Sequence, residues 1–314
     1  MMKPFYYEPF VTELCDPELD GRVPGTPGHD TARTMIVNSL ADLKLEPLLA
    51  SGYEQSYKAA MGGITGRNLL GVKRGTGAQG KWVLLGAHYD HLAGCPGASD
   101  NAASVGVVLE AIRRLSERHH DCDVVVAIFD MEEPPFFNDE RSMGSYIFHD
   151  RCPEGFDLAL LQCAVVLDLV GHQTEIPGKE QSLFALGVQS GPGLKQALFD
   201  AREPLSDLEV YGSSVHVGLS DHNVFYENQR PHLFLTSGRA HHYHTANDTI
   251  DKLDFKKMSN ISELIANFVV SLDRNQTAER FTEDDHAAEM SRFFQKEIDV
   301  DQLPLVLMQL QAKL

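Results

Sequence analysis

Acidic and histidine side chains follow several apolar segments of this chain, in an order that suits a hydrolase with two metal ions. These residues are His88, Asp90, Asp100, Glu132, Glu133, Asp168 and His244. Two metal ions in one site require several carboxylates, a few imidazoles and one further carboxylate that acts as a base. The sequence therefore predicts a metal-dependent hydrolytic site built from distant parts of the chain.

His88 and Asp90 follow the apolar segment Trp82–Ala87, which is typical of a strand covered on both faces. Side chains two residues apart on a strand point to the same side. This spacing suits a metal ligand and a carboxylate that hydrogen-bonds it and fixes its tautomer. The alternative is two loop residues that never meet.

Asp100 precedes a helix that we expect from about Ala102 to Arg118. One interpretation is a helix cap, supplied by Asp100 or Asn101. The other is a carboxylate that bridges two metal ions beside the loop that contains His88. The two interpretations do not exclude each other.

Glu132 and Glu133 come after the expected strand Val124–Phe129 and before two prolines. Adjacent residues in extended chain point opposite ways, so one glutamate can bind metal while the other faces the attacking water as a general base. Asp168 directly follows the apolar segment Ala164–Leu167, where an acid is costly unless it is paired or bound to metal.

A histidine-rich loop follows the expected strand Leu233–Thr236, and His244 is its candidate ligand. For His241 and His242 of the same loop, the simpler interpretation is that they are surface histidines. The same interpretation applies to His172, His216 and His222 elsewhere in the chain. Asp221 and His222 are candidates for groups behind the ligands rather than for ligands.

Strand-like and helix-like segments alternate, which predicts an α/β fold. We expect a three-layer helix–sheet–helix sandwich around a mostly parallel, twisted sheet. Further expected strands and helices are 68–73, 29–43 and 261–272. Ligand sites of such sheets collect at the carboxyl ends of the strands, where all the candidates lie. We expect a catalytic domain over residues 1–276 and a helical C-terminal appendage, 277–314, packed on it.

The formal net charge of −18 argues against nucleic-acid or anionic-membrane partners, since phosphates would be repelled. No apolar segment is long enough to span a bilayer. The first ten residues have no apolar core after a basic end, so we expect no signal peptide and a cytoplasmic location. The five cysteines form no CxxC pair, which indicates neither a thiolate zinc site nor a disulfide framework. The oligomeric state is left open.

The chain resembles the family of co-catalytic zinc aminopeptidases of the bacterial leucyl aminopeptidase type, in the superfamily that also holds glutaminyl cyclases and glutamate carboxypeptidases. The matching stretches extend over most of the chain. They are Leu19–Gly28 (LDGRVPGTPG), Gly86–Asp90 (GAHYD), Pro96–Ala102 (PGASDNA), Asp130–Glu133 (DMEE), Val166–Gly171 (VLDLVG), Ser220–His222 (SDH) and Tyr243–Asp254 (YHTANDTIDKLD).

The resemblance implies two zinc ions and a peptide or aminoacyl substrate. It implies that His88 and Asp168 bind one zinc, that Glu133 and His244 bind the other, and that Asp100 bridges both. It further implies that Glu132 is the catalytic base, that Asp90 orients His88, that Asp221 is a supporting acid, and that the Asp100–Asn101 peptide bond is cis.

One segment departs from the family. Pro134–Met143 is longer than the usual link and is aromatic. Its Phe136 and Phe137 either pack in the core or form a wall of the substrate pocket.

The function that we expect is an aminopeptidase, and three alternatives remain. A glutaminyl cyclase would use one zinc; cyclases of this family tend to have tryptophan before the last histidine, where this chain has Tyr243. A metal-free scaffold of the same fold would lack ligands, which this chain keeps. A carboxypeptidase would need an arginine for the terminal carboxylate, and Arg141, Arg230 and Arg239 are available.

Overall fold

A computed structural model describes residues 7–77, 80–205, 207–211 and 220–274. Its centre is a nine-stranded mixed sheet in the order β1-β3-β5-β4-β6-β9-β7-β8, with β2 paired to β3. The expected C-terminal appendage, 277–314, and His216 lie outside the described residues. None of the described helices has the length and apolar character needed to cross a membrane.

Four adjacent strands in the middle of the sheet are parallel, and they carry the site. They are β5 (Asp123–Phe129), β4 (Trp82–His88), β6 (Leu161–Leu167) and β9 (His232–Thr236). Every residue of β4 is buried, because helices cover both faces of the sheet.

The outer strands are shorter or antiparallel. The strand β3 (Thr65–Lys73) runs antiparallel to β5, and β1 (Glu46–Pro47) and β2 (Glu54–Lys58) pair with β3. At the other edge, β7 (Leu183–Leu186) is antiparallel to β9 and parallel to β8 (Leu208–Tyr211).

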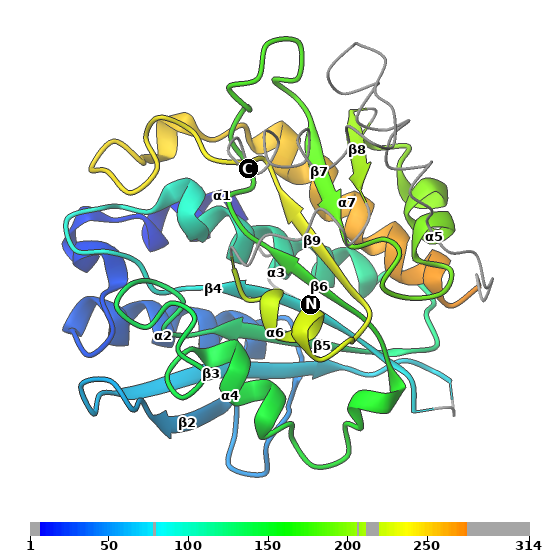
Figure 1. Ribbon diagram of the computed structural model, residues 1–314, viewed down its shortest axis with the longest axis horizontal. Coiled ribbons are helices and arrows are strands. Elements are labelled where there is room, and N and C mark those ends of the chain that lie inside the picture. The colour runs from blue at the N-terminus through cyan, green and yellow to red at the C-terminus, as the bar shows by residue number, and fades with distance from the viewer. Residues whose placement is uncertain (1–6, 78–79, 206, 212–219, 275–314) are drawn as a thin grey trace, which may run out of the picture.

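Helices form a layer on each face of the sheet (Figure 1). One layer contains α1 (Tyr7–Leu14), α2 (Pro27–Asp42), α3 (Ala103–Leu115), α5 (Leu194–Ala201) and α7 (Phe255–Leu272). The other contains α4 (Gly144–Asp150) and α6 (Asn223–Glu227). This arrangement confirms the three-layer α/β fold with a parallel centre.

The start of α3 corrects one expectation. The helix begins at Ala103, and no side chain caps it. Neither Asp100 nor Asn101 is therefore a helix cap: the Asp100 carboxylate faces the site, and the Asn101 amide donates a hydrogen bond to the carbonyl of Leu167 at 3.0 Å.

Candidate metal centre

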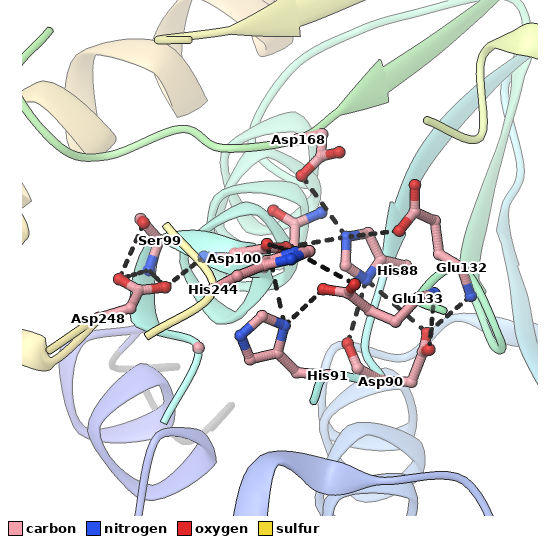
Figure 2. A network of polar contacts seen from close by, with 12 residues as sticks. His88, Asp90, His91, Ser99, Asp100, Glu132, Glu133, Asp168, His244 and Asp248 are labelled. Carbon is pink, nitrogen blue, oxygen red and sulfur yellow. Dashed lines mark hydrogen bonds and ion pairs between the residues drawn. The ribbon is translucent and has the colours of Figure 1, made fainter. Parts of the chain in front are cut away.

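The predicted residues meet at one edge of the sheet (Figure 2). His88 ends β4, Glu132 and Glu133 follow β5, Asp168 follows β6, and His244 lies in the loop after β9. Because the four strands are parallel neighbours, their carboxyl ends bring these side chains together. Asp100 joins them from the turn before α3.

The two oxygens of Asp100 face two different sets of side chains. Oδ1 lies 3.2 Å from His88 Nε2, which is also 3.5 Å from Asp168 Oδ1. Oδ2 lies 3.1 Å from His244 Nε2, which is also 3.2 Å from Glu133 Oε2. Asp100 therefore belongs to two clusters of possible ligands, one with His88 and Asp168 and the other with Glu133, His244 and His91, as a bridging carboxylate would.

These distances fit zinc ligands. Ligand atoms about 2.0–2.1 Å from a tetrahedral zinc ion lie about 3.3 Å from one another. His88 Nε2, Asp168 Oδ1 and His244 Nε2 are moreover buried atoms that make no hydrogen bond with any described residue. Buried polar atoms without a partner are costly, and one metal ion in each cluster would satisfy all three.

Glu132 is close to the clusters but belongs to neither ligand group. Its Oε2 lies 3.7 Å from His88 Nε2. Burial raises the pKa of Glu132 well above its usual value, against the opposing effect of His88, and the nearby carboxylates Asp168 and Glu133 raise it further. A carboxylate with a raised pKa beside a ligand cluster is suited to proton transfer.

The Asp100 carboxylate has the opposite character. Burial alone would raise its pKa, but His91, His244 and His88 hold that pKa well below its usual value. Asp100 therefore stays ionised between the two clusters, where a bridging ligand must be negatively charged.

Asp90 does more than orient His88. The Nδ1 of His88 lies 3.1 Å from the backbone carbonyl of Asp90 and 3.7 Å from its carboxylate. The carboxylate instead accepts hydrogen bonds from the backbone amides of Glu132 at 3.0 Å and Glu133 at 3.1 Å. Asp90 thus links the end of β4 to both glutamates.

Asp248 holds the turn that carries Asp100. Its carboxylate accepts hydrogen bonds from the backbone amides of Ser99 and Asp100 and from the Ser99 hydroxyl. The Asp100–Asn101 peptide bond is cis, which confirms the prediction. Arg22, fully buried, donates to the carbonyls of Tyr89, Pro96 and Gly97 and so ties down the loop before this turn.

Three non-glycine residues at this edge have left-handed backbone conformations, with φ of 60° at Met131, 55° at Leu169 and 57° at His244. Each such residue costs about 1–3 kcal/mol and persists where its surroundings hold it. Their position beside Glu132, Asp168 and the His244 imidazole indicates that the backbone is bent to aim these side chains.

A pocket opens over the two clusters, and its lining includes Phe137, Arg239 and Tyr243. The two phenylalanines of the unusual segment have different places: Phe137 lines the pocket, whereas Phe136 is buried in a cluster with Tyr57, Ala59, Met131 and Ile147. Of the three candidate arginines, Arg239 lines the pocket and its guanidinium lies over the ring of Tyr243. Arg141 and Arg230 are not among the lining residues.

The remaining residues that the sequence singled out, Asp221 and four histidines, differ in their burial. Asp221 is buried, and burial raises its pKa to about 7; its charge also raises the pKa of Glu132. His241 is exposed and contacts Glu175. His242 is buried, contrary to the surface interpretation, with Nε2 3.3 Å from the Ser99 hydroxyl. His172 and His222 are also buried.

Sequence reasoning missed His91. Its Nδ1 lies 2.6 Å from Glu133 Oε1, and Figure 2 shows the imidazoles of His91 and His244 both directed at Asp100 and Glu133. The only sequence signal was its place one residue after Asp90, where a loop residue gives no periodic pattern.

The family model for peptidase family M28 matches residues 68–269. The chain therefore belongs to peptidase family M28, as the sequence resemblance indicated. The uncharacterized protein YfbL of Escherichia coli strain K12 is 25% identical over 219 residues, which cover 59% of this chain and 65% of YfbL.

Solved structures share the fold. A zinc aminopeptidase from Bacillus subtilis superposes with a TM-score of 0.68 at 15% identity, covering 86% of this chain and 95% of its own. A glutaminyl cyclase from Porphyromonas gingivalis superposes with a TM-score of 0.64 at 22% identity, and the match covers 84% of this chain and 96% of the cyclase. An aminopeptidase from an Aneurinibacillus strain superposes with a TM-score of 0.56 at 23% identity, and the match covers 70% of this chain and 51% of the aminopeptidase. The fold is thus common to aminopeptidases and cyclases.

Proposed function

We propose that this protein is a zinc-dependent aminopeptidase with two metal positions. The observation that carries the proposal is the division of Asp100, whose Oδ1 faces His88 and whose Oδ2 faces His244 at 3.2 and 3.1 Å. His88, Asp100 and Asp168 would hold one zinc ion, and Asp100, Glu133 and His244 the other. When bound, such a pair polarises the scissile carbonyl and lowers the pKa of a water.

Glu132 would supply the proton transfer. It is a buried carboxylate beside the clusters that belongs to neither of them, and its raised pKa suits a group that takes a proton and gives it back. In this proposal Glu132 removes a proton from the attacking water and delivers it to the leaving amine. Asp90 fixes the backbone of Glu132, so the carboxylate is aimed before the substrate arrives.

The pocket favours a substrate with a free amino terminus. The pocket is lined by Asp100, Glu133 and Asp168, the proposed zinc ligands, so a free, unprotonated amino group of the substrate would be able to bind one of the zinc ions. Phe137 and Phe234 offer apolar surface for a side chain. Arg239 adds one positive group, which would favour substrates with a carboxylate nearby.

An assay with matched substrates tests the proposal. Leucyl, phenylalanyl and alanyl anilides are compared with acetyl-leucyl anilide, with dipeptides and their amides, and with glutaminyl peptides, while the zinc content is measured. We expect hydrolysis of free-amino substrates, none of the acetylated one, loss of activity with a chelator and two zinc ions per chain. Equal cleavage of the acetylated substrate would contradict the amino-terminal specificity. Cyclisation of glutaminyl peptides by a one-zinc protein would establish the cyclase instead.

A further inference from the structure

His91 is a buried histidine that lies close enough to Asp100, Glu133 and His244 to be a candidate ligand of the second metal position. It lies three residues after His88 in the loop that follows β4, and only 1% of it is exposed. Its Nδ1 is 2.6 Å from Glu133 Oε1. An ionised carboxylate accepts hydrogen bonds and cannot donate them, so the imidazole Nδ1 carries the proton in this hydrogen bond.

The two oxygens of Glu133 have different partners. Oε1 accepts from His91, while Oε2 lies 3.2 Å from His244 Nε2 and faces the second metal position. The backbone amide of Glu133 is bound to Asp90 at 3.1 Å. Glu133 is therefore held at its backbone by Asp90 and at its carboxylate by His91, which leaves one oxygen for a metal ion.

The distances identify His91 as a hydrogen-bond donor rather than as a ligand. Two atoms bound to one zinc ion lie about 3.3 Å apart in a tetrahedral site. The distance from His91 Nδ1 to Glu133 Oε1 is 2.6 Å, which is too short for two ligands of one zinc ion and corresponds to a short hydrogen bond, and the distance to Asp100 Oδ2 is 3.8 Å.

We propose that His91 is a positioning residue that holds the Glu133 carboxylate so that only Oε2 binds the second metal ion, and that His91 thereby sets the zinc affinity of that position. This inference rests on the proposed two-metal function. Groups that hydrogen-bond metal ligands typically contribute about 10-fold to 100-fold to metal affinity. Asp90 contacts His88 and the backbone amides of both glutamates, whereas His91 forms a hydrogen bond with the side chain of Glu133.

Two substitutions separate the roles of donor and ligand. An asparagine side chain places an amide N–H near the position of imidazole Nδ1, so His91→Asn keeps the hydrogen bond, although an amide nitrogen does not ligate zinc. His91→Leu removes both. The zinc bound per chain is measured by equilibrium dialysis across a series of buffered free-zinc concentrations, with thermal melting as the check on folding. His241→Leu, at an exposed histidine, is the matched control.

We expect two binding steps in the wild-type protein. In the Leu variant one of the two steps should move to about 10–100-fold higher free zinc, while the other step stays unchanged. The Asn variant should stay within a few-fold of wild type, and the control should not move. If the Leu variant does not fold, His91→Gln, whose amide reaches the Nε2 position instead, takes its place.

Three outcomes overturn the inference, and they differ in what they leave standing. Equal zinc curves for wild type and the Leu variant would remove His91 from the metal site but leave the two-metal proposal intact. An Asn variant as weak as the Leu variant would make His91 a ligand. A wild-type protein with a single binding step would contradict the proposed function together with the role of His91.

Discussion

The carboxylate of Asp90 accepts a hydrogen bond from the backbone amide of Glu132 at 3.0 Å. A second hydrogen bond, from the backbone amide of Glu133, reaches the other oxygen of the same carboxylate. The strand end that supplies His88 is thereby tied to the strand end that supplies the proposed base and one proposed ligand. The position of the base relative to the first metal position depends on this link.

Asp90→Asn should weaken zinc binding and turnover together. An asparagine side chain has one carbonyl oxygen, so it can satisfy only one of the two backbone amides, and its own NH₂ group would face the other. We expect zinc affinity to fall by about 10–100-fold, as for other partners of metal ligands. Equilibrium dialysis measures this. Asp42→Asn, at an exposed carboxylate at the end of α2, is the control and should behave as wild type.

Glu132→Gln should keep the metal and the fold but lose most of the turnover. A glutamine cannot take a proton from water, and loss of a general base typically costs about 10² to 10⁴ in rate. Zinc content and melting temperature should stay unchanged, because Glu132 belongs to neither ligand group. Glu140→Gln, at an exposed position of the following loop, is the matched control. Turnover within a few-fold of wild type would mean that another group takes the proton.

Phe136→Ala and Phe137→Ala should have opposite consequences. Phe137 lines the pocket, so its loss should lower kcat/KM for leucyl and phenylalanyl substrates by about tenfold, and less for alanyl ones. Phe136 is buried, and its loss should destabilise the protein by about 3–5 kcal/mol with substrate preference unchanged. Steady-state kinetics and urea unfolding of both variants make the comparison. Equal losses on all three substrates for Phe137→Ala would remove it from specificity.

Lys257→Met should remove a pH-dependent part of the stability. Lys257 is buried, donates to the carbonyl of His172 at 2.8 Å, and burial lowers its pKa to about 7, although Asp254 and Asp207 oppose the shift. The unfolded chain, with a lysine pKa near 10.5, therefore binds more protons than the folded one between pH 7 and 10.5.

Because the unfolded chain binds more protons in this range, the free energy of unfolding increases as the pH rises. The free energy of unfolding of the wild type gains a contribution that rises with pH above about 7, with a slope of up to about 1.4 kcal/mol per pH unit. The Met variant lacks this rise. Urea unfolding from pH 6 to 9 should show the stability difference, Met variant minus wild type, shrinking as pH increases. A difference that is constant over this range would show that Lys257 keeps an ordinary pKa.

The sequence by itself determined the class of fold and the positions of the chemical groups. Unbroken apolar segments such as Trp82–Ala87 and Val124–Phe129 identify buried strands, because the pattern is local and does not depend on what packs against it. Polar residues at the ends of such segments, among them His88 and Asp168, stand out for the same reason. The order of these motifs also supported the family and the cis bond at Asp100.

Only the tertiary structure decided what each group contacts. The short strands β7 and β8 have no pattern strong enough to predict, since contacts with neighbouring strands stabilise them. The partners of Asp90 are amides 42 and 43 residues away, and the partner of His91 is 42 residues away. Phe136 and Phe137 are adjacent and identical in type, yet one is buried and the other lines the pocket. Contacts between residues so far apart follow from how the strands are arranged, which local sequence patterns do not encode.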